Sequence, residues 1–167
     1  MKEFWIEIEE SASKEQKQLL LQSAAVLCDV VLVDEGDKDL AKKYGVKKVA
    51  STRDADILVL QTVNKDEISK TKQQPVAVGV KVKINRRVDE ELAIEAANAG
   101  ADYVIVSCSD WKIIPLENLV SKIHGKSKLL FVTSNVDEAR VALEALELGA
   151  DGILLASRDL SEINQTS

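Results

Sequence analysis

The chain repeats one arrangement four times: a helical or polar segment leads into a joint that contains aspartate, and an apolar strand follows. In the last two copies, Gly100 and Gly149 precede the joint, where glycine can adopt the left-handed conformation that ends a helix. Helices that alternate with strands in this way are typical of a parallel sheet. The four joints are Cys28-Asp29 before VVLVDE, Ala55-Asp56 before ILVLQT, Ala101-Asp102 before YVIVSC, and Ala150-Asp151 before GILLAS.

Eight apolar segments are predicted to be strands, and helical segments follow most of them. The connections after the third and the last strand are short. This pattern favours an α/β fold in which residues 1–167 form one compact, somewhat degenerate (βα)8 barrel of the TIM type, with an open doubly wound sheet as the alternative. The predicted strands are Phe4–Glu9, Val30–Glu35, Lys48–Ser51, Ile57–Val63, Val76–Ile84, Tyr103–Cys108, Leu129–Ser134 and Ile153–Ser157, and the predicted helices are Lys14–Leu27, Asp37–Tyr44, Lys65–Lys72, Val88–Ala99, Leu116–His124 and Val136–Leu148.

Composition limits the partners of this domain. The 167 residues are 46% hydrophobic, which is enough for a sizeable core. The net charge of −6 argues against general nucleic-acid binding, although clustered lysines can still attract an anionic small molecule. No apolar run approaches the roughly 20 residues that span a bilayer, and the acidic N-terminus lacks the features of a signal peptide. We expect a cytoplasmic protein that binds a small-molecule substrate, without nucleic-acid or membrane partners; a homo-oligomer stays open.

Ligands of βα folds bind at the carboxyl ends of the strands, so polar residues there are candidates for catalysis. In the segment PVAVGVKVKIN, the two-residue alternation of a strand places Lys81 and Lys83 on one face with Ala77 and Gly79. If that face lines a barrel, both lysines point inward near its mouth, where a lysine can form a Schiff base or hold a carboxylate or phosphate. The alternative is an exposed edge strand with two solvated lysines.

Three further polar residues lie at predicted strand ends. Glu7 shares a strand face with Trp5, and it is a candidate for proton transfer or for an ion pair with an inward lysine. Asp34 is a candidate catalytic carboxylate, or it simply begins the turn into the next helix. Thr133, near the end of the seventh predicted strand, is a candidate substrate ligand.

Common cofactor and metal motifs are missing from the sequence. No glycine-rich dinucleotide fingerprint, no GxxxxGK[ST] phosphate loop and no HExxH motif occurs. Two cysteines far apart and a single histidine argue against a structural zinc site, and we expect no metal. A nucleotide site is therefore predicted to be unconventional or to lie outside this chain.

The segment DWKIIPLENL, which begins at Asp110, follows the sixth predicted strand and is the most distinctive part of the chain. Asp110 and Lys112 are candidate substrate ligands, and Trp111 forms either a wall of the site or a lid on the core. Together with the tracts Ala99–Leu130 and Ala139–Ile163 and the opening KEFWIEIEE, this segment resembles the N-terminal half of the archaeal-type 3-dehydroquinate synthase family.

The resemblance implies an NAD-dependent enzyme that oxidatively deaminates an amino-dideoxy-heptulosonic acid and cyclises the product to 3-dehydroquinate, on the shikimate route to aromatic amino acids. Similar bacterial proteins make 3-amino-4-hydroxybenzoate, so a lyase-like enzyme of that kind is the alternative. Family members have a second, β-rich half, and they usually carry acidic residues where this chain has Ser107 and Ala156. A catalytically silent barrel or a fragment is therefore the third interpretation.

Overall fold

The structure is a computed structural model, and it describes residues 3–8, 13–108, 116–133, 144, 147 and 149–156. Strands and helices alternate along the chain as the repeats predict. The described strands are β1 (Glu3–Glu7), β2 (Val30–Leu32), β3 (Val49–Ser51), β4 (Ile57–Leu60), β5 (Ala77–Ile84), β6 (Tyr103–Cys108), β7 (Lys128–Thr133) and β8 (Gly152–Leu155). The described α-helices are α1 (Lys14–Leu27), α2 (Lys38–Lys43), α3 (Lys65–Thr71), α4 (Glu90–Asn98) and α5 (Leu116–Ile123), and the short 3-10 helices η1 (Glu35–Asp37) and η2 (Arg87–Asp89) precede α2 and α4.

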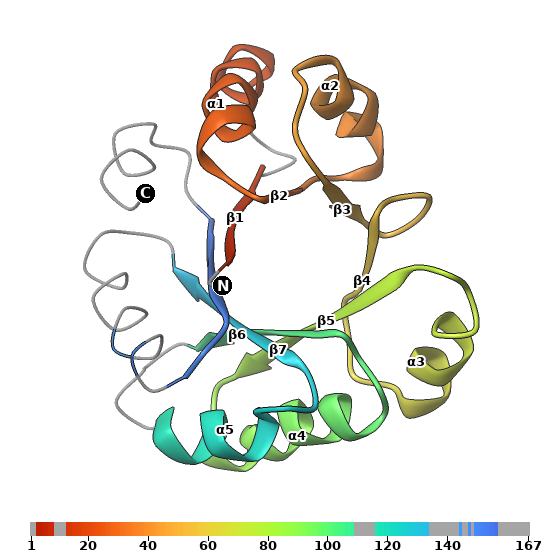
Figure 1. The fold of residues 1–167 in the computed structure, drawn as a ribbon, viewed down its shortest axis with the longest axis vertical. Coiled ribbons are helices and arrows are strands. Elements are labelled where there is room, and N and C mark those ends of the chain that lie inside the picture. Colours follow the sequence, from red (N-terminus) through yellow and green to blue (C-terminus); the bar gives the residue numbers. More distant parts are fainter. Residues whose placement is uncertain are drawn as a thin grey trace.

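The strands close into a barrel. They follow one another in chain order, each parallel to its neighbours, and β8 pairs with β1 to complete the ring. The helices lie around the outside of the ring (Figure 1). The prediction of a (βα)8 barrel is confirmed, and the open doubly wound sheet is excluded.

The aspartates of the four repeated joints each connect two neighbouring strands. The backbone N–H of each aspartate donates to the carbonyl of one residue in the preceding strand, and its carboxylate accepts the N–H of that same residue at 2.8–2.9 Å. We call these residues the strand-start aspartates. They join β1 to β2, β3 to β4, β5 to β6 and β7 to β8, so the barrel wall consists of four similar two-strand units. The pairs are Asp29 with Phe4, Asp56 with Val49, Asp102 with Val78, and Asp151 with Leu129.

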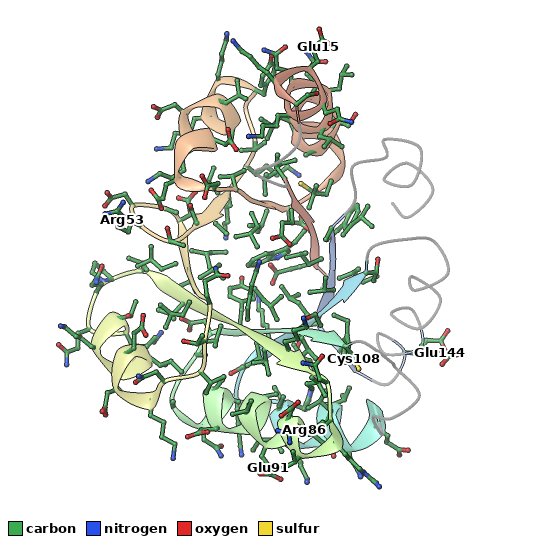
Figure 2. The ribbon with its side chains drawn as sticks, turned by 180° about the vertical axis from the view of Figure 1, so that it is seen from behind. Glu15, Arg53, Arg86, Glu91, Cys108 and Glu144 are labelled. Carbon is green, nitrogen blue, oxygen red and sulfur yellow. The ribbon has the colours of Figure 1, made fainter. Side chains whose placement is uncertain are left out.

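Apolar side chains pack on both faces of the barrel wall. Inward residues, among them Trp5, Ile105 and Leu154, form a core inside the barrel, and outward residues such as Val82 and Ile84 pack under the helices. The predicted facing of β5 is therefore confirmed. Side chains fill the centre of the ring (Figure 2). Because the interior is packed, a ligand can reach the inward side chains only from the two ends of the barrel.

Two local features of the barrel can be compared with the elements predicted from the sequence. The connection from β3 to β4 is a loop with no helix, as the sequence predicts (Figure 1). The predicted strand Val30–Glu35 is too long, because Asp34 begins the turn into η1 and its carboxylate accepts the N–H of Gly36 at 3.4 Å.

The predicted helix Val136–Leu148 lies almost wholly outside the described residues. None of the helices in the described part is both long and apolar enough to cross a membrane.

Candidate functional site

An ion pair lies at the mouth formed by the carboxyl ends of the strands. Glu7, the last residue of β1, and Lys81, in the second half of β5, are joined by an Oε1–Nζ contact of 2.8 Å. Because β1 and β5 are four places apart in a ring of eight strands, this contact spans the interior. The side chains are 25% and 29% exposed, respectively, so a small molecule that enters the mouth can reach both charges.

An apolar floor lies beneath the ion pair. Trp5 precedes Glu7 on the inward face of β1 and is fully buried, while Gly79 precedes Lys81 on the inward face of β5. A side chain at Gly79 would meet atoms of Tyr103, Ile105 and Val59 at 3.5–3.7 Å. The interior is therefore filled to just below the ion pair, which keeps the charged atoms at the mouth.

A cavity of about 370 Å³ lies at this end of the barrel and is called the mouth cavity below. Its size is in the range of small-molecule sites. Besides Glu7 and Lys81, its polar lining comprises Ser51 at the end of β3, and Asp34, Thr52 and Gln61, which follow β2, β3 and β4. Carboxylates, an ammonium group, hydroxyl groups and an amide suit the binding of an oxygen-rich small molecule and the transfer of protons to and from it.

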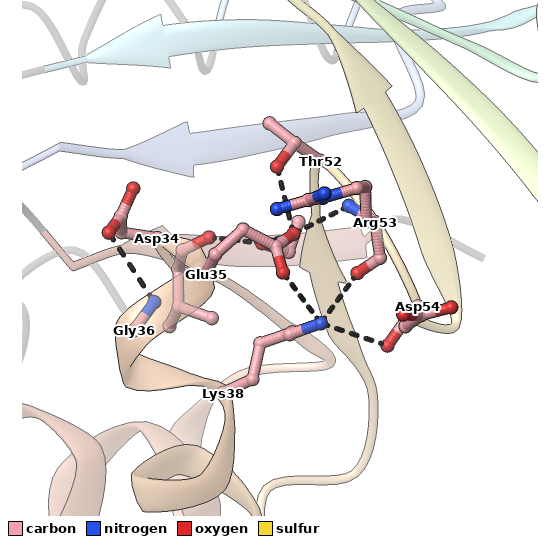
Figure 3. A network of polar contacts seen from close by, with 9 residues as sticks. Asp34, Glu35, Gly36, Lys38, Thr52, Arg53 and Asp54 are labelled. Carbon is pink, nitrogen blue, oxygen red and sulfur yellow. Dashed lines mark hydrogen bonds and ion pairs between the residues drawn. The ribbon is translucent and has the colours of Figure 1, made fainter.

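A second polar network fixes the rim at the β3–β4 loop (Figure 3). The Glu35 carboxylate accepts from Thr52 Oγ1 at 2.8 Å and from the Arg53 N–H at 2.6 Å, and it pairs with Lys38 Nζ at 2.7 Å. These donors, of which Lys38 has the largest effect, lower the pKa of Glu35 from 4.5 to about 2. Since Thr52 also lines the mouth cavity, Glu35 positions part of its wall.

The structure brings some of the predicted site residues together and separates others. Lys83 is exposed further along the inward face of β5, and Asp34 both begins η1 and lines the mouth cavity. Thr133 is buried. The preceding residue, Val132, packs against the inward core, and side chains alternate along a strand, so Thr133 lies on the outward face of β7. Glu7, Lys81 and Asp34 therefore share the mouth, whereas Thr133 faces the helix layer. The remaining candidates, Asp110, Trp111 and Lys112, lie outside the described residues.

Sequence reasoning did not single out Gln61 or Thr52, and it did not foresee the contact between Thr52 and Glu35. Gln61 continues the inward alternation of Ile57 and Val59, so the period of the strand was a usable signal for it. Thr52 and Glu35 are 17 residues apart and meet only because two loops converge at the rim. No local pattern in the sequence marks that contact.

The described residues do not fit a dinucleotide. Sites for NAD commonly place the pyrophosphate at a glycine-rich turn before a helix, where backbone N–H groups face it. The mouth cavity instead presents the carboxylates of Glu7 and Asp34. Within the described ranges, no three His, Cys, Asp or Glu side chains are grouped so that they could hold a metal ion.

The fold and this mouth define the class of the protein: a (βα)8 barrel with a polar site at the carboxyl ends of its strands. Residues 1–167 match the family described as the 3-dehydroquinate synthase II N-terminal domain. The chain belongs to this family, and the resemblance seen in the sequence is confirmed.

Curated relatives are archaeal proteins of about twice this length. The 3-dehydroquinate synthase of Methanocaldococcus jannaschii is 35% identical over 171 residues, which cover 100% of this chain and 47% of that protein. The 3-dehydroquinate synthase of Methanosarcina acetivorans is 34% identical over 188 residues, with 99% and 49% covered. The chain thus spans about half the length of the curated relatives that it matches.

Solved structures share the fold at low identity. Orotidine 5'-monophosphate decarboxylase from Methanocaldococcus jannaschii, complexed with the inhibitor BMP, has a TM-score of 0.73 at 10% identity, with 99% of this chain and 95% of that chain covered. N-(5'-phosphoribosyl)anthranilate isomerase from Pyrococcus furiosus has a TM-score of 0.67 at 12% identity, with 99% and 96% covered. At these identities the likeness shows the barrel fold alone.

Proposed function

We propose that this domain carries the substrate site of a 3-dehydroquinate synthase of the archaeal type. The reaction is the NAD-dependent oxidative deamination and cyclisation of an amino-dideoxy-heptulosonic acid, in cytoplasmic aromatic amino-acid biosynthesis. Family membership supports this proposal. The observation that carries it is the Glu7–Lys81 ion pair at the mouth, because the cyclisation needs a base and an acid side by side.

The ion pair suits the carbon–carbon bond formation of the cyclisation. Glu7 removes a proton from the carbon next to one carbonyl group of the substrate, and that carbon attacks the second carbonyl group. Lys81 donates a proton to the oxygen that becomes negative. The 2.8 Å contact then lets the proton on Glu7 return to Lys81, which restores both groups for the next cycle.

The remaining groups of the mouth hold the substrate. Lys83 is exposed on the same face as Lys81 and suits the substrate carboxylate, while Thr52 and Gln61 can hydrogen-bond its hydroxyl groups. NAD would supply the oxidation when bound. Because the described residues do not fit this cofactor, no step is assigned through it.

Glu7→Gln and Lys81→Met test the acid and base roles. In an assay of 3-dehydroquinate formation with NAD, each variant is expected to lower kcat by about 100-fold or more, which is the usual contribution of a positioned acid or base. Lys65→Met is the matched control, because it makes the same change at a side chain of α3 that is 66% exposed. Full turnover in both mouth variants would overturn the assignment.

A catalytically silent barrel is the second candidate, and it is favoured by Ser107 and Ala156, which stand where the family resemblance leads us to expect acidic residues. Thermal shifts with 3-dehydroquinate and with NAD separate the two. A ligand at about 100 times its Kd stabilises a protein by about 2.7 kcal/mol, which a melting curve resolves. A shift with 3-dehydroquinate that Lys81→Met abolishes supports the substrate site, whereas no shift with either compound supports the silent barrel.

A further inference from the structure

The amino end of the barrel, opposite the mouth, holds a second cavity, called the amino-end cavity below. Its volume is about 340 Å³, close to that of the mouth cavity. Val30 and Tyr103, at the starts of β2 and β6, contribute apolar surface to its lining, and the Tyr103 ring packs against Trp5 with 4.9 Å between ring centroids. In (βα)8 proteins this end usually contributes to stability. The proposed function makes no use of an open cavity there.

Both acidic side chains that line the amino-end cavity already have donors. The Glu3 carboxylate accepts from Trp5 Nε1 at 3.2 Å and from the Tyr103 hydroxyl at 3.2 Å, and it pairs with Lys128 Nζ at 2.7 Å. Burial and the nearby Glu3 raise the pKa of Tyr103 to about 12, so its hydroxyl keeps its proton at neutral pH. Asp29 is the strand-start aspartate that accepts the N–H of β1.

The ammonium groups of the lysines that line this cavity have fewer hydrogen-bond and ion-pair partners than its carboxylates. Lys47 and Lys48, in the loop between α2 and β3, are exposed, and neither ammonium group has a hydrogen-bond or ion-pair partner in the part of the chain that the structure describes. Lys128 gives one donor to Glu3, and an ammonium group has three. The lining therefore carries three lysines against two carboxylates, although the chain has a net charge of −6, and Lys47 and Lys48 are the charges left without a partner among the described residues.

We propose that the amino-end cavity binds a small polyanion, a phosphate or polycarboxylate group, held by the ammonium groups of Lys47 and Lys48. Charge-assisted hydrogen bonds from lysine suit the several oxygens of such a group, and Lys128 keeps donors that can join them. The cavity lies at the end of the barrel away from Glu7 and Lys81. Binding there does not depend on the proposed function, so each can be tested without the other.

Tryptophan fluorescence gives a local readout. The chain has two tryptophans, so Trp111→Phe leaves Trp5, which packs on Tyr103 beside the cavity, as the single reporter. Inorganic phosphate and citrate are titrated at constant ionic strength, with acetate and chloride as monovalent controls. We expect a saturable change with phosphate or citrate and none with the controls. Whichever of phosphate and citrate binds with the lower Kd identifies the kind of polyanion that the site prefers.

Two paired variants of equal charge test the lysines. Lys47→Gln with Lys48→Gln is expected to weaken binding at least tenfold, while Lys42→Gln with Lys43→Gln, at the exposed end of α2 and outside the cavity lining, leaves it unchanged. Melting temperatures of the unsubstituted chain with the same anions provide a second measurement, and circular dichroism checks the folding of each variant. No saturable response by either readout, or equal weakening in both pairs, would overturn the proposal.

Discussion

Two carboxylates in this barrel differ in how many donors surround them. The Glu35 carboxylate binds Lys38, Thr52 and the backbone N–H of Arg53, and these contacts hold the loop between β3 and β4 in place. Glu7 meets only the ammonium group of Lys81 among the described residues. The Glu7 carboxylate therefore keeps oxygen lone pairs that can accept hydrogen bonds from a ligand at the mouth, whereas Glu35 acts on the site through the loop that it holds.

Glu35→Gln is expected to lower the stability of the fold at neutral pH and to change its pH dependence. A carboxyl group whose pKa is lowered on folding, here from 4.5 to about 2, stabilises the folded state above its ordinary pKa. That stabilisation is lost as the pH falls through about 4.5 and on to about 2. Urea unfolding from pH 7 to pH 2 measures the effect.

The difference in unfolding free energy between the parent and Glu35→Gln should therefore be largest near pH 7 and close to zero near pH 2. Lys38→Met removes the largest cause of the lowered pKa, and it should give a change in the same direction. A difference that stays constant over this pH range would contradict the account of Glu35.

At the scale of elements, the sequence predicts most of what the barrel contains. Apolar runs identify the eight strands, and the alternation in β5 correctly assigns its inward and outward faces. The strand-start aspartates can be recognised in the sequence as a repeat, but their hydrogen bonds to the preceding strand cannot. The N–H group that Asp29 binds lies 25 residues earlier in the chain, so only the pairing of β1 with β2 reveals it.

Asp102→Ala tests the strand-start aspartates. The change removes a carboxylate that accepts the Val78 N–H at 2.8 Å and pairs with Lys72 at 2.7 Å. We expect a loss of about 1–2 kcal/mol, since a hydrogen bond to a charged group contributes about 1.5–3 kcal/mol and this side chain is 37% exposed. Urea unfolding measures the loss.

Lys72→Ala separates the two contributions of Asp102, because it removes the ion pair and leaves the backbone hydrogen bond intact. It should cost under about 1 kcal/mol, as exposed ion pairs do. Hydrogen exchange at the Val78 amide should accelerate in Asp102→Ala and not in Lys72→Ala. Equal exchange rates in the two variants would show that the carboxylate does not hold β5 to β6.

At the scale of the whole molecule, the candidate site was only partly predictable. Glu7 and Lys81 are 74 residues apart, and their contact exists because the ring closes and places β1 opposite β5. The sequence predicts an ion pair of Glu7 with an inward lysine, which the structure confirms, but it does not say which of Lys81 and Lys83 makes this contact. Thr133 illustrates the limit: its position near a strand end is predicted, while its facing follows from Val132, which lies inside the barrel.

Closure of the ring depends on Gly152, the first residue of β8. Gly152 pairs with Glu3 in β1 and with Leu130 in β7, at the place where the last strand enters between the first and the seventh. A Cβ at this position would overlap the Glu3 carbonyl oxygen and lie 2.6 Å from Leu130 Cδ2. Gly152→Ala must therefore push β8 away from β1 or move Glu3, whose carboxylate holds Trp5 and Tyr103.

Gly152→Ala should destabilise the barrel by about 2–3 kcal/mol, the usual cost of overpacking, and lower Tm by roughly 5–10 °C. Near-ultraviolet circular dichroism should change as well, because Trp5 pairs with Leu154 along the same seam. Gly36→Ala is the matched control: its added Cβ would meet no atom closer than 3.8 Å, so its stability should stay within about 1 kcal/mol of the parent. If both variants melt at the parent temperature, β8 can shift without cost, and close contact between β8 and β1 is not what holds the ring closed.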